Sequence, residues 1–247
     1  WQLVGFIHGV MNTDNMTISG ETIDYGPCAF MDTFDPDTVF SSIDTEGRYA
    51  YGNQPSIGGW NIARFAECLV PLLVDDEEEA IAIAKGELAD YPKRFMHYYQ
   101  EGMRAKIGVL TEQPGDDELT KQFLQLLIKY DADYTNAFRA LTEKIKPAES
   151  FFITNDFKEW EEKWLARLAK ESRPLEQIFD GMNKVNPAVI PRNHQVERAI
   201  EAAELGDYSV MHKLVDILRT PYELKAKHAE YKLPNDDNQP YRTFCGT

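Results

Sequence analysis

The chain has 247 residues, of which 43% are hydrophobic and 27% charged, and this composition excludes disordered and collagen-like proteins. It is long enough for one large domain or two small ones. Its 26 lysines and arginines stand against 41 aspartates and glutamates, a formal charge of −15 at pH 7, which argues against a nucleic acid or an anionic membrane as a partner.

Neither the apolar runs nor the cysteines indicate a membrane protein or a disulfide scaffold. The longest apolar stretch, residues 68–74, is far shorter than the roughly 20 residues needed to span a bilayer. The cysteines at 28, 68 and 245 are few and scattered, which favours a reducing compartment, with the cytosol as the default. Because the chain opens on Trp1 with no methionine or targeting segment, we expect it to be a piece of a longer protein.

The composition changes along the chain. Residues 1–60 are rich in Gly, Asp, Asn and Thr, whereas residues 61–230 contain successive amphipathic segments and residues 231–247 resemble a tail. We therefore expect a mainly α fold with a small β-hairpin, and chemistry within the first 60 residues. Apolar spacing predicts helices over 60–69, 77–88, 92–107, 116–129, 134–144, 157–170, 196–203 and 209–218. Core or helix-packing positions are expected for Trp60, Phe152, Phe157, Trp160 and Trp164.

The densest chemical signal is residues 8–15, His-Gly-Val-Met-Asn-Thr-Asp-Asn, followed by Asp-Tyr-Gly at 24–26. Two short β-prone stretches flank a Ser-Gly turn between these motifs. If the stretches pair as a hairpin, Asn15 comes opposite Asp24, because paired strands lie only about 4.8 Å apart. A carbonyl oxygen and a carboxylate would then converge, and such ligands suit a magnesium ion that also binds nucleotide phosphates.

The spacing of the first motif also matches that of protein kinases. Kinases place magnesium between the asparagine of H-R-D-L-x-x-x-N and the aspartate of D-F-G. Here His8 precedes Asn15 by the same seven positions. Val10 stands where a kinase has its catalytic aspartate, and the carboxylate of this loop belongs to Asp14. The usual kinase base is therefore missing.

Simpler interpretations exist for the same residues. Asn12, Asp14 and Asn15 are common turn and capping residues, although their combination with Asp24 favours the metal site. His8 is either a ligand or acid, or a buried side chain that holds the backbone through its ring nitrogens, and we favour the second role. Four polar residues fit either the mouth of an active site or an ordinary surface loop: Arg48, Tyr49, Asn53 and Gln54.

These motifs, with several stretches beyond them, resemble the SelO (YdiU) protein adenylyltransferases, a family with a pseudokinase fold. The resembling stretches are 8–16, 22–27, 47–51, 53–55, 186–193 and 199–203. The resemblance implies the carboxyl-terminal lobe of a protein-kinase-like fold, in which ATP binds in a reversed sense. AMP then moves to a Ser, Thr or Tyr hydroxyl of a protein, and pyrophosphate leaves. The resemblance also implies that Asn15 and Asp24 bind the metal, that Asp24 contacts the nucleotide, and that Asp14 accepts the proton.

The resemblance further implies magnesium, or alternatively manganese, as cofactor, ATP as substrate and proteins as acceptors. On this basis residues 1–60 hold the catalytic loop, the metal-binding hairpin and a segment like a kinase activation segment, and residues 61–230 form the helical body of the same lobe. No glycine-rich phosphate loop precedes His8, so we expect the lobe alone to be inactive. The alternatives are a kinase-like phosphotransferase or a non-catalytic helical interaction module, and the oligomeric state stays open.

Members of this family commonly carry a redox-active cysteine or selenocysteine third from the carboxyl end, where Cys245 lies. The resemblance therefore suggests a reversible disulfide, and we expect Cys28 as the partner because it follows the Asp-Tyr-Gly motif. An unpaired tail thiol is the alternative.

Overall fold

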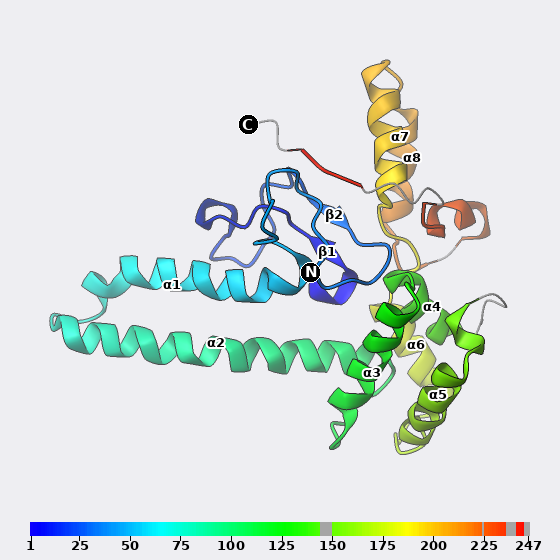
Figure 1. Ribbon diagram of the computed structural model, residues 1–247, viewed down its shortest axis with the longest axis horizontal. Helices are drawn as coiled ribbons and strands as arrows, with labels where there is room; N and C mark the ends of the chain where they lie inside the picture. The colour runs from blue at the N-terminus through cyan, green and yellow to red at the C-terminus, as the bar shows by residue number, and fades with distance from the viewer. Residues whose placement is uncertain (144–149, 224, 236–240, 245–247) are drawn as a thin grey trace. The chain divides into compact units, whose positions relative to one another are not determined.

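The computed structural model describes residues 1–143, 150–223, 225–235 and 241–244, and this part of the chain is mainly helical (Figure 1). It divides into two compact units. The helical unit lies within residues 1–5, 30–34 and 100–240, and the loop unit lies within residues 6–29, 35–99 and 241–247. In the described residues, every helix is either too short or too polar to cross a membrane.

The loop unit contains most of the irregular chain. Strand β1 (Phe6–Ile7) pairs with β2 (Ala29–Phe30) in a two-stranded antiparallel sheet, and short 3-10 turns form at η2 (Thr13–Asn15) and η3 (Tyr51–Asn53). The sheet confirms a small β element. Its strands are not the two stretches that the sequence predicted to pair, because those stretches lie between β1 and β2.

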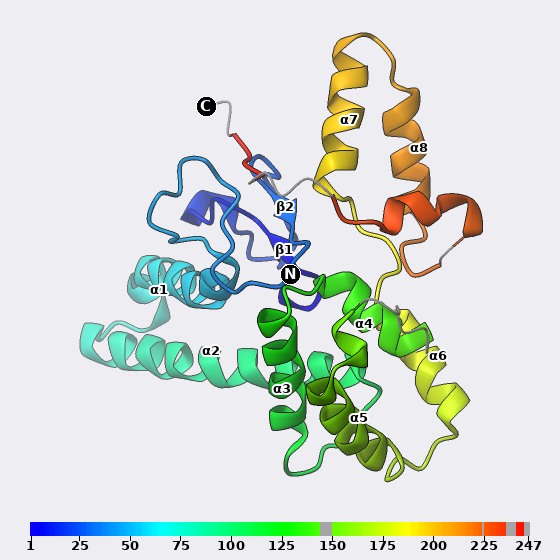
Figure 2. The ribbon, with the colours of Figure 1, turned by 45° about the vertical axis from the view of Figure 1, so that its right-hand side comes forward.

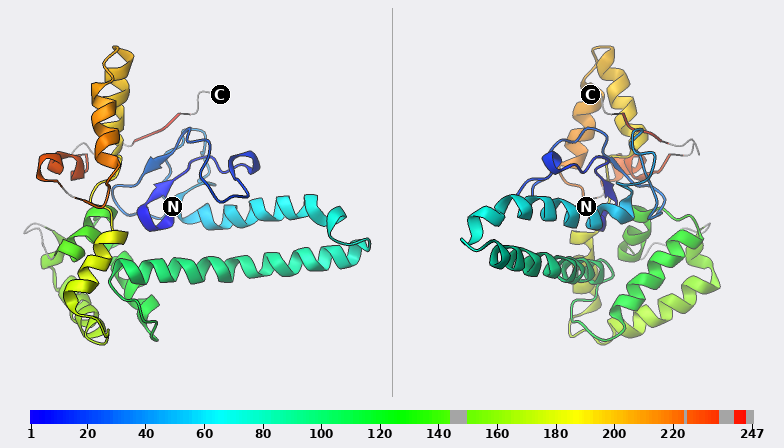
Figure 3. Two further views of the ribbon diagram at one scale, coloured as in Figure 1. Left: turned by 180° about the vertical axis from the view of Figure 1, so that it is seen from behind. Right: turned by 60° about the vertical axis from the view of Figure 1, so that its left-hand side comes forward.

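Helices α1 (Gln54–Leu73) and α2 (Glu77–Lys106) run side by side (Figure 3). Pro55 lies in the first turn of α1, where its fixed φ favours the helix and its missing N–H is not needed. Acidic residues in the first turn of α2 and basic ones in its last turn complement the helix dipole. The sequence predicted a break before Pro92, but α2 continues through it. Proline has no N–H, so one backbone carbonyl in the preceding turn of α2 loses its hydrogen bond. Pro92 is exposed, so water can bond to that carbonyl instead.

The helical unit holds the remaining helices (Figure 2). They are α3 (Asp116–Lys129), α4 (Tyr134–Glu143), α5 (Asn155–Leu168), α6 (Leu175–Val185), α7 (Asn193–Glu204) and α8 (Ser209–Leu218), with 3-10 turns η1 (Gln2–Val4), η4 (Phe151–Ile153) and η5 (Ala226–Lys232). The predicted bounds of α3 and α8 are confirmed. The short helix α6 was not predicted, although its two buried residues, Ile178 and Met182, have the i, i+4 spacing of a helix face.

The core of the helical unit is aromatic. Trp160 of α5 packs on Phe123 of α3 with ring centroids 4.6 Å apart, and its indole N–H donates to the carbonyl of Leu119 at 2.9 Å. Trp164 is buried beside it and donates to the carbonyl of Ile107 at 2.7 Å. Phe152 and Phe157 are buried as well, so four of the five predicted core aromatics are confirmed.

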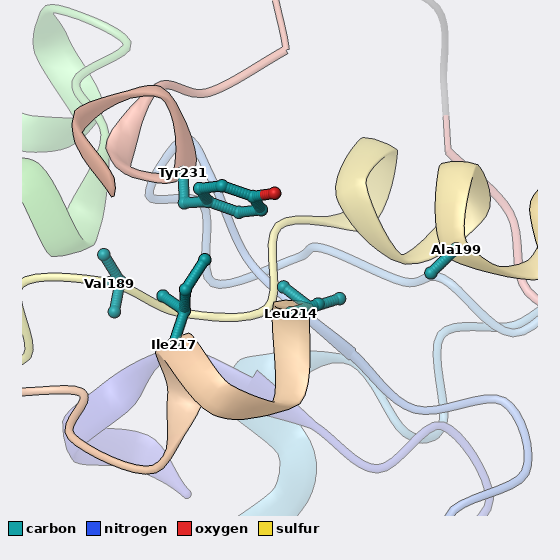
Figure 4. Packing of buried hydrophobic residues seen from close by; sticks show 5 residues of the cluster. All are labelled: Val189, Ala199, Leu214, Ile217 and Tyr231. Carbon is teal, nitrogen blue, oxygen red and sulfur yellow. The ribbon is translucent and has the colours of Figure 1, made fainter. Parts of the chain in front are cut away.

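A smaller apolar cluster joins α7, α8 and η5. It consists of Val189, Ala199, Leu214, Ile217 and Tyr231 (Figure 4). Tyr231 comes from η5 and is only 6% exposed, so it covers the apolar side of the α7–α8 pair. The start of the predicted tail is therefore part of this cluster.

Two buried polar side chains, Asn186 and Arg192, anchor loops of the helical unit. Asn186 Nδ2 donates to the carbonyl of Lys106 at 2.8 Å. Arg192 forms ion pairs with Asp32 and Asp133, at 2.5 and 2.6 Å. Because a buried guanidinium needs carboxylate partners to offset its lost hydration, these ion pairs hold the chain before α7 in place.

Candidate functional site

His8 is fully buried at the start of the predicted catalytic loop. Its Nε2 donates to the carbonyl of Ile23 at 2.8 Å, and its Nδ1 accepts from the amide of Val10 at 3.4 Å. In this arrangement Nε2 is the donor of the ring and Nδ1 its acceptor. His8 thus connects the loop to the residue that precedes Asp24, which is the backbone-holding role we favoured.

Asn15 closes the short turn η2. Its side-chain Nδ2 donates to the carbonyl of Val10 at 3.0 Å, and its backbone amide donates to the carbonyl of Asn12, also at 3.0 Å. Within the described chain, Asn15 Oδ1 accepts no hydrogen bond. The amide is therefore fixed in orientation while its oxygen remains available to a ligand.

The hairpin predicted between the two motifs is reduced to a single antiparallel bridge between Met16 and Thr22. Counted back from this bridge, Ile23 is opposite Asn15, so the predicted register, with Asp24 opposite Asn15, is wrong by one residue. Isolated two-stranded hairpins are marginal in water. Ile18 at the turn is 88% exposed, so no buried face stabilises longer strands here.

Asp24 has a left-handed backbone, with φ at +51°. Aspartate is among the few non-glycine residues that adopt this conformation, which nonetheless costs energy and occurs often at functional sites. The carboxylates of Asp24 and Asp14 are exposed and have no hydrogen-bond or ion-pair partner in the described residues. Both are free to bind a cation or accept a proton.

Gly9 allows the two motifs to approach closely. It has φ at +86°, and a Cβ at this position would lie 2.7 Å from the carbonyl oxygen of Pro27. The same oxygen accepts a hydrogen bond from the hydroxyl of Thr243 at 2.6 Å, so part of the predicted tail lies on this segment. The structure therefore brings the backbones of the two predicted motifs together, at His8–Ile23 and at Gly9–Pro27.

Helix α1 supports the loop through two buried amides. Gln54 Nε2 donates to the carbonyl of Phe6, and Gln54 Oε1 accepts from the amide of His8, both at 2.9 Å. Asn61 Nδ2 donates to the carbonyl of Met11 at 2.9 Å. Sequence reasoning missed both roles, since Gln54 was expected at the mouth of the site or on a surface loop. The sequence carried one signal for Asn61: it is polar, yet it lies on the same face of α1 as the buried Ile57.

Tyr49 lies beside the loop, and its hydroxyl donates to Asn12 Oδ1 at 2.8 Å. The turn before it is closed by Asp44, which accepts from the amides of Arg48 and Tyr49. The guanidinium of Arg48 lies 4.9 Å from the ring centre of Trp60. Trp60 is 41% exposed, so the core alternative predicted for it is wrong. Its ring lies against the arginine, a common use of tryptophan at the surface.

The family model "Protein adenylyltransferase SelO" matches residues 1–219 of the chain. The chain belongs to the SelO family.

Bacterial relatives with the name "Protein nucleotidyltransferase YdiU" are similar over the whole chain. The protein from Geobacillus kaustophilus is 59% identical over 249 aligned positions, which cover 100% of this chain and 51% of the relative. The proteins from Halalkalibacterium halodurans and Alkaliphilus metalliredigens are 55% and 54% identical, with the same coverage. The chain thus spans about half the length of the curated relatives it matches.

The donor set at the SelO motifs suits a hard cation. The described residues contain no group of three or more His, Cys, Asp and Glu side chains arranged to hold a metal. Magnesium does not need one, because it keeps several waters and binds through one or two protein oxygens together with substrate phosphates. Asn15 Oδ1 and the Asp24 carboxylate, both without partners in the described chain, fit that requirement.

The cysteine pairing falls partly outside the structure. Cys28 is half-buried, and burial raises the pKa of its thiol above the usual value, which lowers its thiolate fraction. Cys245 lies outside the described residues. The Cys28–Cys245 disulfide therefore stays a prediction.

Proposed function

We propose that the chain is the carboxyl-terminal, kinase-like lobe of an enzyme that transfers AMP from ATP to Ser, Thr or Tyr hydroxyls of proteins. Membership of the SelO family, and the name of the nucleotidyltransferases it resembles, support this reaction class. The observation that carries the proposal is the close approach of the loop at 8–16 to the segment at 22–27. Three side chains of these two segments have oxygens without a partner in the described residues: Asp14, Asn15 and Asp24.

Each of these residues has a role in the proposal. Asn15 and Asp24 would hold magnesium or manganese, and Asp24 would thereby contact the bound nucleotide. Such a cation neutralises phosphate charge. Asp14 would accept the proton of the acceptor hydroxyl as its oxygen bonds to the α-phosphorus of ATP and the bond from that phosphorus to the pyrophosphate oxygen breaks.

The residue at the kinase base position favours AMP transfer over phosphoryl transfer. Val10 is buried and has no group that accepts a proton or orients an alcohol. The carboxylate of Asp14 lies four positions after Val10 and directly precedes Asn15, so it does not occupy the position of a kinase base. An acceptor served by Asp14 would therefore approach the nucleotide differently from a kinase substrate.

We expect these 247 residues alone to transfer little AMP. No lysine, arginine or histidine pairs with Asp14 or Asp24 in the described structure, so the site adds negative charge next to a triphosphate. Fixing and neutralising phosphates is most of what such an enzyme does. Positive groups from outside this site would have to complete the nucleotide clamp.

ATP labelled separately at the α and γ positions tests the proposal in the full-length protein. We expect the α label, and not the γ label, to become bound to acceptor protein, with release of pyrophosphate and dependence on magnesium or manganese. Transfer of the γ label would instead show a phosphotransferase. Absence of metal-dependent ATP binding would support a non-catalytic interaction module.

A further inference from the structure

Asn61 of α1 contacts the candidate metal-binding turn from both sides. Its Nδ2 donates to the carbonyl of Met11 at 2.9 Å and also contacts the Met16 sulfur. These two methionines flank η2, the turn that ends in Asn15. The side chain of Asn61 thus joins the beginning and the end of the turn to one rigid helix.

The orientation of this amide is determined by its surroundings. A carbonyl oxygen accepts hydrogen bonds, so the nitrogen of Asn61, and not its oxygen, must face Met11. Asn61 is only 5% exposed, and its Oδ1 is buried with no hydrogen-bond partner among the described residues. A buried polar atom without a partner lowers stability. The nitrogen of Asn61 thus restrains the turn, while its oxygen adds nothing to stability.

The contact with Met11 bears directly on Asn15. Asn15 is oriented by its own hydrogen bond to the carbonyl of Val10, the residue next to Met11. Val10 and Met11 are buried, so movement of their peptide would move the support of the Asn15 amide. Asn61 donates to the carbonyl of Met11, which belongs to the next peptide, and so it restrains the residue that shares a peptide with the Val10 carbonyl.

We propose that Asn61 is a positioning residue, which sets the orientation of Asn15 Oδ1 toward the divalent cation. This inference rests on the proposed function, because it assumes that Asn15 is a ligand. Residues that orient metal ligands typically change metal affinity or activity by about 10- to 100-fold when they are lost. Asn61 should therefore control metal affinity more than the stability of the protein.

The chain offers a matched control in Asn186 of the helical unit. Asn186 is also buried, its Nδ2 donates to the carbonyl of Lys106 at 2.8 Å, and its Oδ1 likewise has no partner in the described residues. Its side-chain nitrogen bonds to Lys106 and Thr142 within the helical unit, and Asn186 lies outside the segments 8–16 and 22–27. Loss of Asn186 should reproduce the structural consequence of losing a buried asparagine without the effect on the cation.

The experiment compares Asn61→Leu with Asn186→Leu in the full-length protein. Leucine keeps the side-chain volume and removes the amide; Asn61→Ala and Asn186→Ala serve as a smaller pair if the leucine variants do not fold. Free Mn²⁺ is measured by electron paramagnetic resonance with an ATP analogue that carries a methylene group between the α- and β-phosphorus atoms. The thermal midpoint of each variant is measured in parallel.

We expect Mn²⁺ affinity to fall by about 10- to 100-fold in the Asn61 variants and to stay at the wild-type value in the Asn186 variants. Equal Mn²⁺ affinity in wild-type and Asn61 variants, with a lowered thermal midpoint, would overturn the inference and leave the proposed function intact. Failure of the wild-type protein itself to bind Mn²⁺ with the analogue would overturn both.

Discussion

The Nε2 atom of His8 donates a hydrogen bond of 2.8 Å to the carbonyl of Ile23, and this bond connects the loop that carries Asn15 to the segment that carries Asp24. His8 is buried, so water does not compete for the bond. The ring therefore contributes to the candidate site through the backbone it holds. In the proposal the chemistry belongs to other residues of these two segments: the exposed Asp14 and Asp24 and the half-buried Asn15.

The first prediction concerns the metal ligands in the full-length protein. Asp24→Ala should abolish AMP transfer, and Asn15→Ala should lower it by more than about 100-fold, because each removes an oxygen ligand of the cation. Asp131→Ala is the matched control, since Asp131 is also exposed and also has a left-handed backbone, with φ at +47°. Near-normal AMP transfer by Asp24→Ala, measured with ATP and magnesium, would contradict the assignment.

The second prediction separates proton transfer from nucleotide binding. Asp14→Ala should lower kcat by about 10²- to 10⁴-fold, the usual contribution of a general base, while the affinity for ATP changes little. Asp37→Ala changes another exposed carboxylate of the loop unit and should leave both quantities unchanged. If Asp14→Ala affected only ATP affinity, Asp14 would be a ligand of the cation and not the proton acceptor.

The helices were predictable where local pattern alone determines them. The bounds of α3 and α8 follow from apolar spacing, but α2 continues through Pro92 because the lost hydrogen bond faces water. The β-prone stretches around the Ser-Gly turn form a single bridge, since exposure of Ile18 leaves them no core to pack against. Whether a short stretch pairs depends on whether other parts of the chain bury it. The sequence of the stretch itself does not determine that.

The candidate site was likewise predictable only in part. Its candidate ligand residues were predicted from motif spacing, because the chemistry of a ligand is visible in its residue type. Its supports, Gln54 and Asn61, were missed because apolar periodicity counts hydrophobic residues, and a buried amide that binds backbone looks like an interruption of the pattern. Only tertiary contacts over about 50 positions of sequence identify them as partners of the loop.

The third prediction tests the close approach of the two motifs. Gly9→Ala should destabilise the protein by several kcal/mol, since the left-handed backbone costs roughly 1–2 kcal/mol and the overlap with the Pro27 carbonyl adds roughly 1–3 kcal/mol. Gly20→Ala is the control, because Gly20 has φ at +75° but nothing lies within 4 Å of a Cβ there. Urea unfolding measures both free energies. Equal losses would show that the loop does not pack tightly against Pro27.

The last prediction concerns Lys106 at the end of α2. Its side chain is fully buried, and burial lowers the pKa of its ammonium group from 10.5 to about 7. The nitrogen lies 4.2 Å from the ring centre of Phe138 and 5.2 Å from that of Tyr134, contacts that favour the charged form but offset burial only in part.

Because the pKa is lower in the folded than in the unfolded state, the unfolded state binds more protons between pH 7 and pH 10.5. Lys106 should therefore make the free energy of unfolding rise with pH across this window, by at most about 1.4 kcal/mol for each pH unit. Below pH 7 the penalty for a buried charge is fully present. Lys106→Met should remove this dependence and raise stability most near pH 6. Urea unfolding of both proteins from pH 6 to pH 10 measures the difference, and parallel curves would mean that Lys106 stays charged when folded.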